Sequence, residues 1–194
     1  MAAPLPAPYV TAAEYLARER RSAVKSEYLD GYIVAMAGVR RAHSLISTNL
    51  ARLLETQLEE RPCEVHIADM RVKVSARNVY TYPDIAVVCG DAHYEDRYGD
   101  TLLNPTVLIE ILSPSTEDYD RGVKFDYYRH LPSLREYLLV AQTGMHVEHF
   151  ILQEEDWVLT EAHDPATVLY LPSIECRLPM SRIYNKVGDG APTR

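Results

Sequence analysis

The sequence has no apolar run that approaches the roughly 20 residues of a membrane-spanning helix. Its first residues, MAAPLPAPYV, also lack the positively charged start and the apolar centre of a secretory signal. We therefore expect a cytoplasmic protein whose first segment, residues 1–10, is an extended tail.

Cysteine is scarce as well. The chain contains three cysteines, Cys63, Cys89 and Cys176, which are far apart and form no CxxC pair. This odd number at distant positions predicts no disulfide framework, which is consistent with a reducing cytoplasm.

Positive charge is not in excess. The chain has 20 lysines and arginines against 28 aspartates and glutamates, which gives a net charge of −8. That balance disfavours a general nucleic-acid coat protein. It leaves room for a nuclease, because carboxylates that hold metal ions add to the negative count. Hydrophobic residues make up 47% of the 194 positions, which is enough for the core of one domain.

The N-terminal part predicts a helix followed by a hairpin. Thr11 and Glu14 have the spacing of a capping box, which begins a short helix. Asp30 and Gly31 then separate two apolar-rich segments, which is a strong hairpin signal, and Glu27 lies on the first strand of that hairpin.

The rest of the chain alternates between helical and strand patterns. Leucines at helical spacing predict a helix from Ala42 to Glu60, and residues 90–105 read as a polar loop. We expect a central mixed sheet that contains Asp84–Val88, Val107–Leu112 and Glu136–Val140, with Trp157 in a peripheral hairpin. The predicted fold class is α/β (α+β), with helices flanking the central sheet.

Glu110 carries the strongest functional signal. It sits inside Val107–Leu112, a strand apolar enough to be covered on both faces. An unpaired carboxylate at such a position costs free energy or binds a proton, so Glu110 needs a metal ion or a lysine as its partner.

The following segment supplies that lysine. A helix expected from Glu117 to Leu131 places Asp120, Lys124 and Tyr128 on one face, at i, i+4 and i+8. A buried carboxylate on a strand followed by an inward lysine on a helix predicts a catalytic site.

Asp84 completes the set, because it follows a proline at the start of the strand that precedes Glu110. Sequential strands joined by one loop are usually neighbours, so the two carboxylates can ligate one hard cation such as Mg²⁺. The carbonyl of Ile111 is a further candidate ligand. Such a cation would polarise a phosphoryl oxygen and lower the pKa of a bound water, and Lys124 could orient that water. The pattern predicts phosphodiester hydrolysis.

Several segments occur in the order that is typical of a known family, namely Glu27–Gly31, Met36–Gly38, His43, Pro83–Val87, Ile109–Thr116, Asp120, Lys124, Tyr128 and Glu136–Tyr137. On these segments, residues 10–175 resemble the Uma-two family of restriction endonucleases, within the PD-(D/E)XK nuclease superfamily. The resemblance implies a restriction-endonuclease-like core as a single domain over residues 11–186. It also implies DNA as the substrate and Mg²⁺, or Mn²⁺ in its place, as the cofactor.

Carried over residue by residue, the resemblance assigns Asp84 to the motif aspartate and Glu110 to the (D/E) position. Leu112 stands where the superfamily has its lysine, and Lys124 on the next helix takes that role. Glu27 matches an early glutamate of the family and is a further carboxylate for the site.

Structural interpretations of the same residues remain open. Asp84 can be a turn residue, Glu110 and Lys124 can form a structural salt bridge, and Lys124 with Asp120 can belong to a solvated helix face.

Three other positions also have plain structural interpretations. Glu27 would face solvent unless its hairpin joins the main sheet. His43 is typical of a polar residue at a helix start, and Tyr128 of core packing.

Two functions follow from these alternatives: a Mg²⁺-dependent endonuclease, or a catalytically inactive α/β interaction protein that keeps the nuclease fold. We also expect a homodimer, since an edge strand and 14 tyrosines offer an association surface. The Gly- and Pro-containing segment 187–194 is expected to be a flexible tail.

Overall fold

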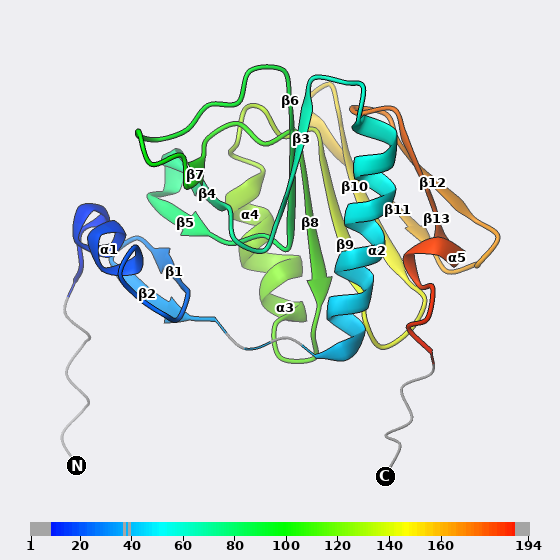
Figure 1. The fold of residues 1–194 in the computed structure, drawn as a ribbon, viewed down its shortest axis with the longest axis horizontal. Coiled ribbons are helices and arrows are strands. Elements are labelled where there is room, and N and C mark those ends of the chain that lie inside the picture. The colour runs from blue at the N-terminus through cyan, green and yellow to red at the C-terminus, as the bar shows by residue number, and fades with distance from the viewer. Residues whose placement is uncertain (1–8, 37, 39, 189–194) are drawn as a thin grey trace, which may run out of the picture.

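The computed structural model describes residues 9–36, 38 and 40–188 (Figure 1). Most of the two expected tails, residues 1–8 and 189–194, lies outside the described residues. Val10 and Val187, which adjoin these tails, both pack against buried side chains. Among the described helices, none combines the length and the apolar character needed to cross a membrane.

The helical elements are, in chain order, α1 (Ala12–Glu19), α2 (Arg41–Leu58), the 3-10 turn η1 (Ser75–Arg77), α3 (Glu117–Tyr119), the π-helical turn η2 (Asp120–Lys124), α4 (Phe125–Tyr128) and α5 (Met180–Ile183). The strands are β1 (Ser26–Leu29), β2 (Tyr32–Ala35), β3 (Cys63–Ile67), β4 (Arg71–Val74), β5 (Val79–Thr81), β6 (Ile85–Cys89), β7 (Thr101–Leu102), β8 (Val107–Leu112), β9 (Glu136–Ala141), β10 (Val147–Gln153), β11 (Asp156–Ala162), β12 (Val168–Leu171) and β13 (Cys176–Pro179).

The central sheet has the strand order β11-β10-β9-β8-β6-β3. Strands β8 and β9 run parallel, and the other pairs in this sheet run antiparallel. The predicted mixed sheet is therefore confirmed, with β6, β8 and β9 at its centre. Trp157 lies in the β10–β11 hairpin at the periphery. Its ring packs edge-on against the ring of Phe125, with the two centroids 5.5 Å apart.

Helix α2 covers one face of the central sheet, as Figure 1 shows. Its apolar residues recur at helical spacing and bury Ile46, Leu50, Leu54 and Leu58 against that face. Asn49 on the same side donates hydrogen bonds of 2.9 Å to carbonyls at the end of α5. The predicted helix is confirmed. The packing of its buried residues against the sheet holds the first turn of α2 beside the end of β8.

The helical segment 117–128 covers the opposite face. Tyr128 and Phe125 pack there against Tyr137 of β9, with ring centroids 5.4 Å apart in both pairs. The expectation of a regular helix to Leu131 was wrong in two respects. The segment ends at Tyr128, shortly before Pro132 would interrupt it, and its middle turn is π-helical.

The N-terminal hairpin joins a second sheet, with the strand order β2-β1-β5-β4-β7. Asp30 and Gly31 form the predicted turn with φ values of 42° and 101°. Helix α1 begins with the predicted capping box between Thr11 and Glu14. The segment 90–105 is not entirely loop, because β7 pairs with β4 in parallel.

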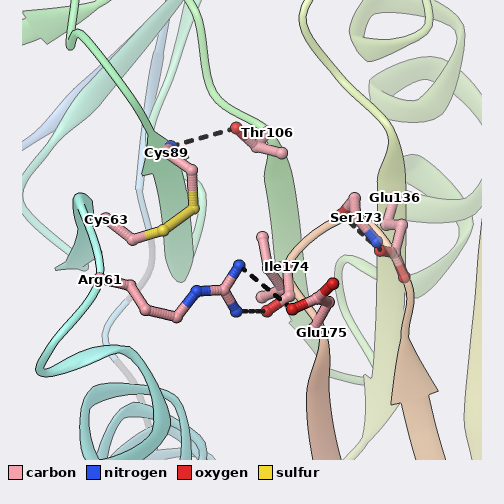
Figure 2. Close-up of a disulfide and its surroundings, with 8 residues drawn as sticks. All are labelled: Arg61, Cys63, Cys89, Thr106, Glu136, Ser173, Ile174 and Glu175. Carbon is pink, nitrogen blue, oxygen red and sulfur yellow. Dashed lines mark hydrogen bonds and ion pairs between the residues drawn. A yellow bond between two sulfur atoms is a disulfide. The ribbon is translucent and has the colours of Figure 1, made fainter.

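The cysteine expectation was also wrong, since a disulfide joins Cys63 and Cys89 (Figure 2). These two residues face each other at the end of the β3–β6 ladder, with Cα atoms 4.0 Å apart. Their separation in sequence concealed a pairing that only the strand register reveals. Cys176 is free and buried. Beside the disulfide, Arg61 donates a hydrogen bond to the carbonyl of Ile174 (Figure 2).

Candidate active site

A cavity of about 520 Å³ opens where the end of β8, the first turn of α2 and the β1–β2 hairpin meet. All four site residues predicted from the sequence line it: Glu27, Asp84, Glu110 and Lys124. They come from four different segments, so the cavity exists only in the folded chain.

Two contacts hold Asp84 in the wall of this cavity. Its Oδ2 accepts a 2.7 Å hydrogen bond from the backbone N–H of Ile111, and its Oδ1 lies 3.0 Å from Nε2 of His43. The antiparallel register pairs Ile85 with Ile109. One position further along the ladder, Asp84 therefore stands opposite Glu110, as cross-strand neighbours do.

Glu110 is buried in the predicted strand β8. Its Oε1 lies 3.0 Å from Nζ of Lys124 and accepts a 2.8 Å hydrogen bond from the hydroxyl of Tyr128. Burial raises the pKa of Glu110 well above its usual value; Lys124 opposes this shift, and Asp120 and Asp84 reinforce it. Burial thus disfavours the charge on this carboxylate even with a lysine beside it.

Lys124 is the charge at the centre of the site. The π-helical turn directs its Nζ to within 3.0 Å of Glu110, 3.3 Å of Glu27 and 3.5 Å of Asp120. Burial opposes the charge on Lys124, but these three carboxylates outweigh it and hold the pKa of the amine above its usual value. A solvated helix face is ruled out for Lys124 and Asp120, because both side chains are buried.

Glu27 does not face solvent, since its hairpin pairs with β5 and buries it. Its Oε1 accepts from the backbone N–H of Tyr82 at 3.3 Å, and its Oε2 accepts from the hydroxyl of Tyr119 at 3.2 Å. Because both oxygens are engaged, Glu27 is held in place, and its Oε1 lies 3.3 Å from the Lys124 amine.

Two residues, Asp120 and His43, take part in the site although the sequence did not single them out as site residues. Asp120 lines the cavity, and burial raises its pKa. Its position four residues before Lys124 was the available signal. His43 contacts Asp84 directly, which its place in the first turn of a helix did not reveal.

The donor set fits a hard cation. Four carboxylates, from Glu27, Asp84, Glu110 and Asp120, line the cavity together with two cationic side chains, Lys124 and Arg40. Burial is the main cause of the raised pKa values of Glu110 and Asp120, and repulsion from the neighbouring carboxylates adds to it. Oxygen donors with a net negative charge are what Mg²⁺ and Mn²⁺ bind, and Asp84 and Glu110 are the pair best placed to hold such an ion.

Comparisons with known proteins extend this picture. A family model described as "Putative restriction endonuclease" (Uma2) matches residues 12–181. Two proteins of Synechocystis sp. are similar along most of their length. The protein sll1609 is 37% identical over 153 residues, which is 78% of this chain and 86% of the relative. The protein slr1290 is 36% identical over 181 residues, which is 92% of this chain and 93% of the relative. The names of these two relatives state no activity.

The fold has a counterpart among solved structures. The crystal structure of "a putative nuclease belonging to DUF820" from Anabaena variabilis aligns with a TM-score of 0.74 and 19% identity. The alignment covers 92% of this chain and 99% of that one. This likeness confirms the predicted fold, and the family match supports a nuclease.

Proposed function

Because the chain belongs to the Uma2 family of restriction endonucleases, we propose that it is a metal-dependent endonuclease that hydrolyses DNA at the Glu110 cavity. One observation carries the proposal: Asp84, Glu110 and Lys124 line a single open cavity. Mg²⁺, or Mn²⁺ in its place, is the proposed cofactor.

Asp84 and Glu110 are the proposed ligands. The hydrogen bond from the N–H of Ile111 and the contact with His43 hold Asp84 in one orientation, so the site is preorganised on the strand ends. When bound, the cation would polarise a phosphoryl oxygen and lower the pKa of a coordinated water.

Lys124 is the proposed partner of the attacking water. A buried ammonium group that stays charged can orient a water molecule and stabilise the negative charge that develops on the phosphoryl group. Glu27 and Asp120 keep the amine at this place, since they lie 3.3 Å and 3.5 Å from Nζ. Tyr128 performs a similar task for Glu110 through its hydroxyl.

A second candidate has one observation in its favour. The amine of Lys124 already contacts three carboxylates, which is also the geometry of a structural ion-pair network. Such a network would suit a catalytically inactive α/β interaction protein that keeps the nuclease fold.

A cleavage assay separates the two candidates. Supercoiled plasmid and linear duplex are incubated with the protein in Mg²⁺, in Mn²⁺ and in chelator. The endonuclease proposal expects metal-dependent nicking or cleavage that Glu110→Gln and Asp84→Asn abolish. Glu175→Gln is the matched control, because Glu175 is an exposed glutamate near the disulfide (Figure 2) and does not line the cavity. Equal activity of Glu110→Gln and wild type, or none with either metal, would favour the inactive protein.

The proposal includes a homodimer. Strand β11 is an edge of the central sheet, and Val158 and Leu159 on it are exposed by 38% and 46%. Pairing of two such edges would place two cavities in one particle, which suits the two strands of a duplex. A cytoplasmic location stays a prediction, and the Cys63–Cys89 disulfide removes the cysteine argument for it.

A further inference from the structure

Two histidines and a glutamate meet at one end of the β10–β11 hairpin. The register pairs Val147 with Ala162, so His146 and His163 follow as the next cross-strand pair. Their rings are stacked, with centroids 4.2 Å apart and an angle of 13° between the planes. Glu161 precedes His163 by two residues and therefore projects from the same face of the strand.

The three side chains are close enough to share one ion. Nε2 of His146 lies 3.0 Å from Oε1 of Glu161, and one ligand atom from each of the three residues lies within 4.8 Å of the other two. Ligands at about 2.0–2.1 Å around a tetrahedral ion are about 3.3 Å apart, which is close to the separation of His146 and Glu161. For the second imidazole to contact the same ion, its ring would have to turn out of the stack.

The site is partly preorganised through the backbone of His146. The N–H of His146 donates to the hydroxyl of Tyr184 at 3.1 Å. The carbonyl of His146 accepts from the same hydroxyl at 2.7 Å and from the N–H of Ala141 at 3.0 Å. His163 and Glu161 are exposed, so a cation and its remaining water ligands have free access.

The donor atoms determine which cation fits. Two imidazole nitrogens with one carboxylate oxygen suit Zn²⁺ and its neighbours Co²⁺, Ni²⁺ and Cu²⁺, whereas Mg²⁺ prefers an all-oxygen set. None of the three residues lines the Glu110 cavity. The two candidate sites thus differ in place and in chemistry.

We propose that His146, Glu161 and His163 form a binding site for a Zn²⁺-class cation, separate from the nuclease site. The bound ion ties the strand end at His163 to the turn at His146, and so closes the open end of the β10–β11 ladder. A single surface histidine next to a glutamate would not form such a binding site. The pair of His66 and Glu64, 3.1 Å apart, has no second histidine and provides the comparison.

The experiment is calorimetric titration of the full chain with ZnCl₂ in excess Mg²⁺, which occupies the oxygen-rich cavity. Wild type and Glu110→Gln should each bind one Zn²⁺ at this site. His163→Ala should weaken that binding at least about tenfold, and Glu161→Gln should weaken it in the same direction. His66→Ala should bind as wild type does.

A second measurement guards against an indirect effect. At one Zn²⁺ concentration, the melting temperature should rise more for wild type and His66→Ala than for His163→Ala, because a ligand that binds only the folded state stabilises it in proportion to its affinity. Because His163 is exposed, its removal should leave the fold intact. Equal Zn²⁺ affinity in wild type and His163→Ala, or no Zn²⁺ binding by wild type, would overturn the proposal.

Discussion

Lys124 Nζ lies 3.0 Å from Glu110 Oε1, although the lysine comes from a helix and the glutamate from the strand before it. In the PD-(D/E)XK pattern that the sequence resembles, the lysine follows the carboxylate on the same strand, where this chain has the buried Leu112. The π-helical turn η2 brings the amine back to the carboxylate from the opposite layer. In this chain the lysine that contacts Glu110 therefore comes from the helical segment after the strand.

Lys124→Ala should destabilise the fold by about 3–5 kcal/mol near neutral pH, because it leaves buried carboxylates without their cation. Glu110 and Asp120 already have raised pKa values, so they can take up protons and the loss should shrink as the pH falls. Divalent metal binding should persist or strengthen, and any cleavage should drop by orders of magnitude. Chemical denaturation at several pH values and metal titration check these outcomes.

The control for this variant is Lys73→Ala. Lys73 also pairs with a carboxylate, at 2.5 Å from Glu95, but on the second sheet and away from the cavity. It should lose stability modestly and keep any cleavage activity. Equal loss of cleavage in both variants would mean that stability, not Lys124, limits activity.

His43→Ala should lower cleavage about 10- to 100-fold, as is usual when a residue that orients a metal ligand is removed. The reason is that His43 holds Oδ1 of Asp84 at 3.0 Å. The variant should still fold, because other side chains of α2 form its buried face. Cleavage rates over a range of Mg²⁺ concentrations test this, and rates equal to those of wild type throughout that range would contradict it.

Asp100→Asn should cost about 1–3 kcal/mol of stability at neutral pH, the range for hydrogen bonds to charged groups. Asp100 accepts from Nε of Arg20 at 2.8 Å and lies 2.6 Å from Nη2 of the buried Arg71. The hydrogen bonds from Arg20 hold the pKa of Asp100 below its usual 3.8. Partial burial raises this pKa, and Arg71 lowers it further.

The sign of the pH dependence follows from that depressed pKa. The contribution of the Asp100 carboxylate to the free energy of unfolding is complete above pH 3.8. It is lost as the pH falls below 3.8 toward the pKa of Asp100 in the folded state. The free-energy difference between wild type and Asp100→Asn should therefore narrow in acid. Asp96→Asn is the control, since Asp96 bonds to Arg20 without Arg71 and should cost less. A difference that widens below pH 3.8 would contradict the account.

Val158→Lys tests the proposed dimer. A lysine on the edge strand β11 should block pairing between two copies, because charged edge residues prevent strand addition. Light scattering should give the dimer mass for wild type and the monomer mass for the variant at micromolar concentration. A monomer mass for wild type would remove the dimer from the account.

The sequence predicted those parts of the fold that local patterns determine. Helix α2 follows from its leucine spacing, β8 from its apolar run, and the β1–β2 turn from Asp30 and Gly31. Glu110 was recognisable because a carboxylate in a buried strand is costly wherever the strand lies.

What the sequence missed depends on contacts between distant segments. Glu27 became buried only because its hairpin pairs with β5, and Cys63 meets Cys89 only through the β3–β6 register. The contact of His43 with Asp84 likewise requires α2 and β6 to be packed together. No local pattern encodes these approaches.

The most direct test of the central claim, that Glu110 holds a catalytic cation, is thermal melting with and without Mg²⁺. At a concentration about 100 times the dissociation constant, Mg²⁺ should stabilise wild type by about 2.7 kcal/mol, or about 5–10 °C for a chain of this size. Glu110→Gln should fold well, because burial already raises the pKa of Glu110 and disfavours its charge. Its melting temperature should not respond to Mg²⁺. An equal Mg²⁺ response in wild type and Glu110→Gln would show that Glu110 is a structural residue and contradict the account.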